Sequence, residues 1–136
     1  MTVSVVRTSV FLLAENRLLR EALARILGKK TDIEVVGARS YSATVLSAIM
    51  AAPPHVVLFN PIEARSCLGF LAELREGLPA ARVVMIGMEL NSELFIQAVR
   101  AGIAGYMLTD ATAAEIVAAV RSVVRGGTVC PPANSR

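Results

Sequence analysis

The chain has 136 residues, a net charge of +3 and a composition that is 54% hydrophobic but only 4% aromatic. This length suits one domain with a substantial core, and the aliphatic composition is typical of sheets covered by helices on both faces. The scattered basic residues do not favour nucleic-acid binding by this segment, and no apolar run reaches the roughly 18 residues of a membrane span. We expect a cytoplasmic domain that needs no cofactor and does not contact a membrane.

Short apolar runs alternate with segments of helical periodicity along the whole chain. Each run has the length and continuous hydrophobicity of a buried parallel strand. The predicted strands are Ser9–Ala14, Ile33–Gly37, Val56–Phe59, Arg82–Ile86 and Gly105–Leu108. Each strand is followed by a segment in which apolar residues recur at helical spacing, so five helices are predicted.

Residues that can cap or stop a helix flank these helical segments. Ser, Thr, Asn and Asp side chains accept hydrogen bonds from the first free amides of a helix. The candidate N-caps are Asn16, Ser42, Asn91 or Ser92, and Asp110 or Thr112. Glycine or proline ends each helix, and the last one runs from about Ala113 to Arg125.

Five strand-then-helix repeats with short connections predict a doubly wound α/β domain built on a parallel sheet. The domain fills residues 1–126, and residues 127–136 form a polar tail that contains proline. Ligands of such sheets gather at the carboxyl ends of the strands. Those ends are Ala14–Glu15, Asn60–Pro61, Gly87–Met88 and Thr109–Asp110.

Three separated segments, Thr8–Leu23, Pro54–Asn60 and Glu93–Gly127, carry a resemblance that extends over the domain. They resemble the receiver domains of LuxR/NarL-type two-component response regulators, most closely in the run ELFIQAVRAGIAGYMLTDATAAEIVAAVRSVVRGG. The resemblance implies a flavodoxin-like, five-stranded parallel sheet with strand order 2-1-3-4-5. It also implies that the tail begins a linker to a DNA-binding domain outside this chain.

Receivers that this chain resembles use an acidic pair, an acceptor aspartate, a hydroxyl and a lysine in phosphorylation. In this sequence the acidic pair falls on Ala14 and Glu15, the acceptor on Asn60, the hydroxyl on Gly87 and the lysine on Thr109. Only Glu15 keeps the chemical character that the resemblance implies. The sequence therefore predicts a degenerate phosphorylation pocket and no catalytic residue.

Each replacement removes one part of the phosphorylation chemistry. The neutral carboxamide of Asn60 is a poor nucleophile and forms no acyl phosphate. Magnesium prefers hard oxygen ligands and neutralises charge during phosphoryl transfer, and Glu15 alone makes a weak metal candidate. Thr109 brings no positive charge, and Gly87 brings no hydroxyl.

Three of these positions leave alternatives open. Glu15 is either a relic metal ligand or a solvated loop carboxylate, and we prefer the second interpretation. Asn60 either binds a small ligand or satisfies local backbone groups, as asparagine commonly does in turns. Tyr106 occupies the position of the aromatic that switches rotamer in receivers, and we expect it here to be fixed and partly buried.

The last predicted helix has more apolar residues than one buried stripe requires. Surplus apolar area at a surface indicates a contact partner. We therefore prefer homodimerisation through this helix, which receivers commonly use, over tight internal packing. The candidate dimer residues are Ile116, Val117, Val120, Val123 and Val124.

The sequence thus predicts a pseudo-receiver, a regulatory domain whose output is set by dimerisation or a protein partner rather than by phosphate. It would form the amino-terminal part of a helix-turn-helix transcriptional regulator, with DNA bound only by a domain outside this chain. The alternative is a small-molecule sensor that uses the vacated pocket. An enzyme on the same fold has little support, because no glycine-rich phosphate loop or nucleophile–base pair is present.

Overall fold

A computed structural model describes residues 7–61, 63 and 67–130, in which strands and helices alternate. The strands are β1 (Thr8–Ala14), β2 (Ile33–Arg39), β3 (Val56–Asn60), β4 (Arg82–Met88) and β5 (Gly105–Leu108). The helices are α1 (Arg17–Gly28), α2 (Val45–Ala51), α3 (Cys67–Gly77), α4 (Ser92–Arg100) and α5 (Ala113–Val124). The strands pair in parallel in the order β2-β1-β3-β4-β5, which confirms the predicted fold class.

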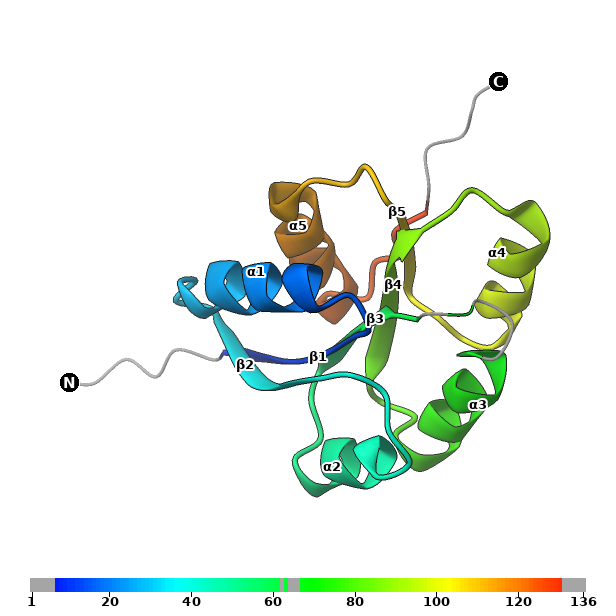
Figure 1. Ribbon diagram of the computed structural model, residues 1–136, viewed down its shortest axis with the longest axis horizontal. Helices are drawn as coiled ribbons and strands as arrows, with labels where there is room; N and C mark the ends of the chain where they lie inside the picture. Colours follow the sequence, from blue (N-terminus) through cyan, green and yellow to red (C-terminus); the bar gives the residue numbers. More distant parts are fainter. Residues whose placement is uncertain (1–6, 62, 64–66, 131–136) are drawn as a thin grey trace.

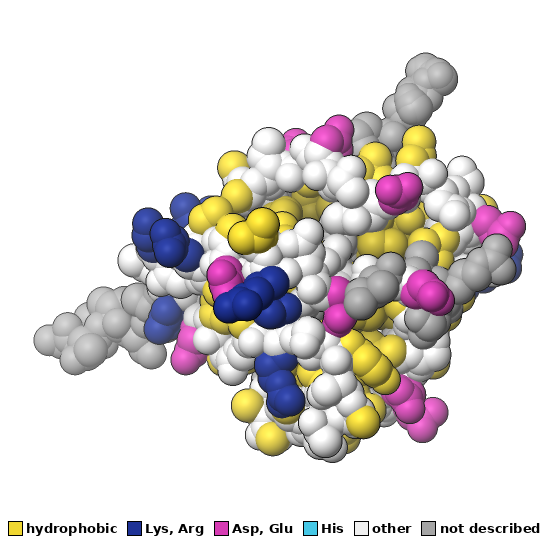
Figure 2. Space-filling view, in the orientation of Figure 1, with side chains coloured by type: hydrophobic (Ala, Val, Ile, Leu, Met, Phe, Trp, Pro, Cys, Tyr) yellow, Lys and Arg dark blue, Asp and Glu magenta, His cyan; other side chains and the backbone are white. Residues whose placement is uncertain are grey.

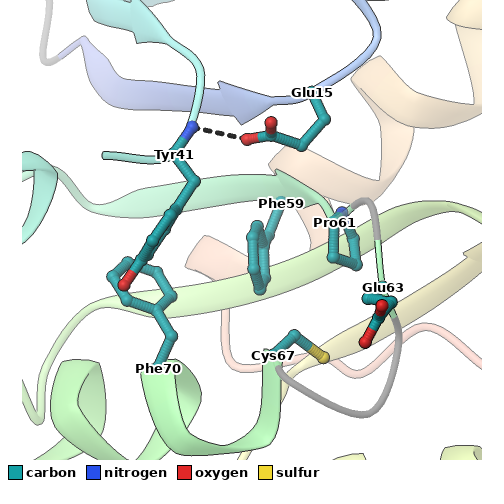
Figure 3. A pocket seen from close by; sticks show the side chains of 7 residues that line it. All are labelled: Glu15, Tyr41, Phe59, Pro61, Glu63, Cys67 and Phe70. Atoms are coloured by element: carbon teal, nitrogen blue, oxygen red, sulfur yellow. Dashed lines mark hydrogen bonds between the residues drawn. The ribbon is translucent and has the colours of Figure 1, made fainter. Parts of the chain in front are cut away.

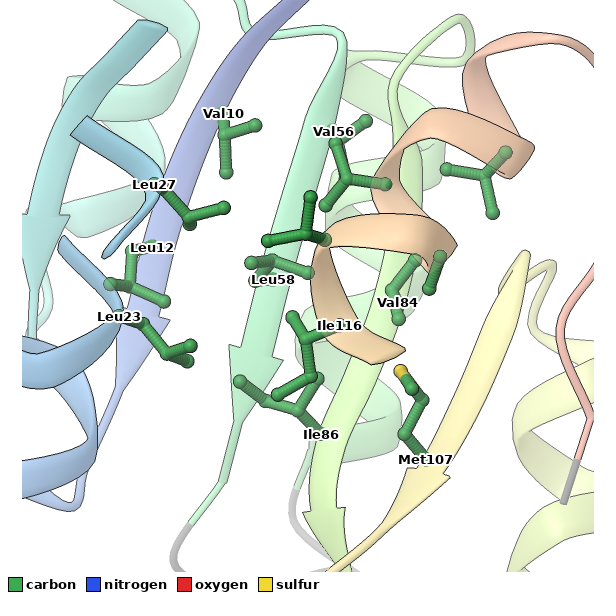
Figure 4. Packing of buried hydrophobic residues seen from close by; sticks show 14 of the residues in the cluster. Val10, Leu12, Leu23, Leu27, Val56, Leu58, Val84, Ile86, Met107 and Ile116 are labelled. Carbon is green, nitrogen blue, oxygen red and sulfur yellow. The ribbon is translucent and has the colours of Figure 1, made fainter. Parts of the chain in front are cut away.

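Helices cover both faces of the sheet, so the sheet separates two hydrophobic cores (Figure 1). One core lies under α1 and α5, where Leu12 and Leu58 of the sheet meet Leu23 of α1 and Ile116 of α5 (Figure 4). The other core lies under α2, α3 and α4. Strand β3 is buried along its whole length because it lies in the middle of the sheet.

The helix N-termini agree with the predicted caps in three cases and differ in one. The side chains of Asn16, Asn91 and Thr112 each accept a hydrogen bond from the backbone amide three residues on. The predicted cap Ser42 is wrong, because α2 begins at Val45 with Thr44 at its N-cap and no capping bond from a side chain. Helix α2 is consequently shorter than its apolar pattern predicts.

The chain after α5 returns to the sheet and lies along the outer edge of β5. The backbone of Val129 accepts a hydrogen bond from Tyr106 N at 2.9 Å and donates one to Ala104 O at 2.9 Å. These bonds satisfy backbone groups that an edge strand would otherwise leave unpaired. The described part of the predicted tail therefore packs on the domain.

Charge is distributed unevenly over the face that Figure 2 shows. In this view most Lys and Arg side chains lie on the side of α1, whereas most of the visible Asp and Glu side chains lie on the opposite side. A bidentate salt bridge links α5 to the turn before β2, where two guanidinium nitrogens of Arg121 each lie 2.9 Å from an oxygen of Asp32.

Among the described residues, every helix falls short of the length and hydropathy that a bilayer-spanning segment requires.

Candidate functional site

Parallel strands bring their carboxyl ends to one edge of the sheet, and this edge holds the predicted pocket residues (Figure 1). Ala14 and Asn60 are directly paired between β1 and β3. The amide of Glu15 then donates to Asn60 O at 3.0 Å, and the amide of Thr109 donates to Met88 O at 3.0 Å. The predicted strand ends thus meet, although Thr109 itself is exposed.

The Asn60 side chain forms the centre of this edge and is only 8% exposed. Its Oδ1 accepts a hydrogen bond from Asn16 N at 3.2 Å, and its Nδ2 donates one to Ile86 O at 3.1 Å. The carboxamide therefore joins the start of α1 to the end of β4 across β3. A carboxylate could keep the first bond but has no hydrogen to donate to Ile86 O when ionised.

Gly87 lies directly against this carboxamide. Its backbone has φ +66°, a left-handed conformation that residues with a side chain rarely adopt. A Cβ atom at this position would lie 2.6 Å from Asn60 Nδ2. The backbone and its neighbour therefore disfavour a serine or threonine here, for a reason that the sequence alone does not reveal.

The Glu15 carboxylate accepts a hydrogen bond from the backbone amide of Tyr41 (Figure 3). It is partly exposed, as expected of a loop carboxylate. Its neighbour Ala14 is fully buried, and the Ala14 carbonyl accepts a hydrogen bond from Arg20 of α1. Within the described part of the chain, no cluster of three or more His, Cys, Asp or Glu side chains could hold a metal ion.

Tyr106 points inward and is 0% exposed, so the expectation of a partly buried ring is wrong. Its hydroxyl donates a hydrogen bond to Glu89 O at 3.0 Å. Its ring contacts Phe95 of α4 edge to face, with centroids 5.2 Å apart. Burial raises the pKa of the Tyr106 hydroxyl, because water is removed from the charged form.

Helix α5 uses most of its apolar residues inside the domain. Of the five candidate dimer residues, Ile116, Val117, Val120 and Val123 are buried against the sheet and α1, and Val124, at 40% exposed, reaches the surface. The expectation of a surplus apolar surface on this helix is therefore wrong for the four buried residues. The helix packs across β3, β4 and β5 while it also touches α1, so a broad apolar face is needed for internal packing.

An open cavity of about 330 Å³ lies beside the strand ends (Figure 3). Its lining residues are Glu15, Tyr41, Phe59, Pro61, Glu63, Cys67 and Phe70. Asn60, Gly87 and Thr109 do not line it. Sequence reasoning missed this cavity because its walls come from β3, α3 and the segment before α2, which converge only in the folded chain.

No family model matches the chain. The transcriptional regulatory protein MctR of Rhizobium johnstonii is 34% identical over 120 residues, which are 88% of this chain and 56% of that protein. The chain thus spans about half the length of this curated relative. The relatives carry the names of transcriptional regulators and not of enzymes.

Solved receiver structures have the same fold. The signal receiver domain of NarL from Mycobacterium tuberculosis is 28% identical, with a TM-score of 0.78 over 89% of this chain and 98% of that one. A LuxR-family two-component response regulator from Aurantimonas is 20% identical, with a TM-score of 0.77 over 90% of this chain and 89% of that one. At this lower identity the match concerns the fold alone. Strand order, fold and relatives together support a receiver-like domain, similar to those of LuxR/NarL-type transcriptional response regulators.

Proposed function

We propose that this domain regulates without being phosphorylated. The observation that carries the proposal is the Asn60 side chain, which occupies the acceptor position. This side chain is buried, and it forms hydrogen bonds with the backbone of Asn16 and of Ile86. A neutral amide is a poor nucleophile, and this one already has a structural role. The position is therefore filled by a fixed group rather than left open for a phosphoryl group.

Three further positions support the same proposal. Gly87 has neither a hydroxyl nor room for one beside Asn60. Thr109 supplies no positive charge for phosphoryl oxygens, and one oxygen of the Glu15 carboxylate is already bonded to the Tyr41 amide. Phosphoryl transfer depends on positioned charges, so these changes together remove more than the acceptor.

The test is intact-mass analysis after incubation with acetyl phosphate and magnesium. We expect no phosphoryl adduct on the chain. An Asn60→Asp variant should also remain unmodified, because Gly87 and Thr109 still lack the hydroxyl and the charge. Phosphorylation of the carboxylate introduced in this variant would contradict the claim that the whole set is lost, and a magnesium-dependent phosphoryl adduct on the unchanged chain would contradict the proposal itself.

We further propose that the domain is the amino-terminal part of a cytoplasmic helix-turn-helix regulator. The relatives are transcriptional regulators of which this chain spans about half, so DNA would be bound by a domain outside these residues. The output would depend on a homodimer or a protein partner. Because most of α5 faces the core, exposed apolar residues elsewhere, such as Leu90 and Ile96 near α4, are better candidate contacts.

Ligand sensing is the second candidate function, and the cavity beside Glu15 favours it. This cavity shares Glu15 with the predicted phosphorylation pocket, but Asn60, Gly87 and Thr109 are not among its lining residues. Its volume of about 330 Å³ lies at the lower end of the range of small-molecule sites, which is roughly 300 to 1,000 Å³.

A further inference from the structure

The cavity that Glu15 lines has an apolar floor. Phe59, Cys67 and Phe70 are all buried, and they form its inner surface. Burial raises the pKa of the Cys67 thiol, so this group stays uncharged at neutral pH. The floor therefore suits the apolar body of a small molecule.

Aromatic rings meet at steep angles around this floor. The rings of Tyr41 and Phe70 are perpendicular with centroids 5.4 Å apart, and those of Phe59 and Phe70 are inclined at 56° at the same centroid distance. Rings inclined in this way do not stack on one another, and Figure 3 shows them grouped around one space. An aromatic face carries negative potential and attracts cations.

The charged groups of the lining are acidic among the residues that the structure describes. Glu15 and Glu63 line the cavity, and no Lys, Arg or His stands among these described lining residues. The Tyr41 amide holds one oxygen of the Glu15 carboxylate, so the charge is fixed in place before any ligand arrives. The Glu15 carboxylate repels an anion, whereas it attracts a cation in a site partly shielded from water.

We propose that this cavity binds a small organic cation, an amine carried on an apolar or aromatic body. The ammonium group would lie between the Glu15 carboxylate and the Tyr41 ring, and the body would lie on Phe59 and Phe70. Apart from the Glu15 and Glu63 carboxylates, the lining residues that the structure describes present aromatic rings, a proline and a thiol rather than hard oxygen ligands, so an organic cation fits better than magnesium. The inference deepens the ligand-sensing candidate and does not depend on whether the domain is phosphorylated.

Three probes of similar shape and different charge test the inference: phenethylamine, the neutral 2-phenylethanol and the anion 3-phenylpropanoate. Amide NMR spectra of the 136-residue chain are recorded during each titration. We expect phenethylamine to shift the Tyr41 and Glu15 amides saturably, and to bind about tenfold more tightly than the alcohol, as a cation–π contact with a carboxylate predicts. The anion should not bind.

Variants assign the binding to the named groups. Glu15→Gln keeps an oxygen for the Tyr41 amide but removes the charge, so amine affinity should fall about tenfold. Tyr41→Ala should weaken it similarly, whereas Tyr41→Phe keeps the ring face and should restore it. Tyr41 is 53% exposed, so these changes should leave the melting temperature nearly unchanged. Glu73→Gln, an exposed charge on α3 that does not line the cavity, is the matched control.

Each contrary result has a distinct meaning. Equal affinity for amine and alcohol would overturn the cation inference but leave ligand sensing intact. No saturation by any probe would overturn the inference and would count against the ligand-sensing candidate as well. Magnesium chloride that shifts the same amides saturably and displaces the amine would overturn it in favour of a residual metal site.

Discussion

The edge around Asn60 and the helix α5 differ in how their residues are used. At the edge, a polar side chain is buried and bonded on both sides, to Asn16 and to Ile86. On α5, apolar residues that looked suited to a surface contact, Val120 among them, lie in the core. The amide at the end of β3 thus has a structural role, and a helix expected to face a partner faces its own sheet.

The difference shows that side-chain chemistry can be inferred from sequence more safely than the exposed surface of a helix. The identity of the Asn60 side chain limits its chemistry whatever the conformation of the loop that follows β3, since an amide cannot act as a carboxylate nucleophile. The number of apolar residues on a helix does not tell how much of the helix a sheet will cover. The following predictions test the two regions in turn, from the largest expected effect to the smallest.

Val120→Asp should be the most damaging change, because it buries a carboxylate in the core under α5. We expect the free energy of unfolding to fall by more than about 4 kcal/mol, which urea denaturation measures. Val124→Asp on the same helix is the control and should cost less than about 0.5 kcal/mol, since Val124 is partly exposed. Similar costs at both positions would show that α5 does not pack as described.

Asn60→Leu should be the next largest change. It removes the donor for Ile86 O and the acceptor for Asn16 N, and leaves both backbone groups unpaired. We expect a loss of about 3 kcal/mol in the free energy of unfolding. The exposed cap Asn91→Leu serves as the control and should cost about 1 kcal/mol. An equal or smaller loss at Asn60 would mean that its carboxamide does not join α1 to β4.

Gly87→Ala tests the close approach between Gly87 and Asn60. The change adds left-handed strain and a Cβ atom at 2.6 Å from Asn60 Nδ2, so a cost of about 2 to 3 kcal/mol is expected. Gly126→Ala has the strain without a close neighbour and should cost about 1 kcal/mol. The difference in thermal stability between the two variants measures the contact itself. No difference would contradict the packing of Gly87 against Asn60.

The pair between Asp32 and Arg121 should give the smallest effect, visible mainly in pH dependence. The hydrogen bond from Arg121 holds the pKa of the Asp32 carboxyl below its ordinary value. Because the folded-state pKa is lowered, the stabilisation is present above the ordinary aspartate pKa and is lost as pH falls through the folded value. NMR titration should show the Asp32 pKa rising towards its ordinary value in Arg121→Gln but not in Arg125→Gln.

Much of the fold could be predicted because the spacing of apolar residues and the positions of glycine and proline indicate the same elements along the chain. The run GYML predicts β5 with the bounds that the structure has, and Thr112 caps α5 as expected. Strand β4 extends past its predicted end at Ile86 to Met88, and its pairing with β5 is irregular between Met85 and Met88, where Gly87 has a positive φ that the sequence pattern does not reveal. The cap of α2 was wrong because Ser42 and Thr44 are equally suitable in sequence and only packing selects the start.

The candidate site was predictable only where strand ends define it. Glu15 and Asn60 follow adjacent strands, so their meeting follows from topology. The partner of Glu15 is a backbone amide of Tyr41, and Phe70 reaches the same cavity from α3. Neither contact follows from spacing along the chain, because both depend on how the segment before α2 and the helix α3 pack on β3.

The most direct test of phosphorylation independence is an amide NMR titration with beryllofluoride and magnesium, which together mimic a bound phosphoryl group. The account predicts that spectra and oligomeric state stay unchanged, with no shift at Asn60, Gly87 or Tyr106. Saturable, magnesium-dependent shifts that spread from Asn60 to Tyr106 would contradict it. Such a result would mean that the carboxyl ends of the strands still bind and respond to a phosphoryl group despite the Asn60 amide.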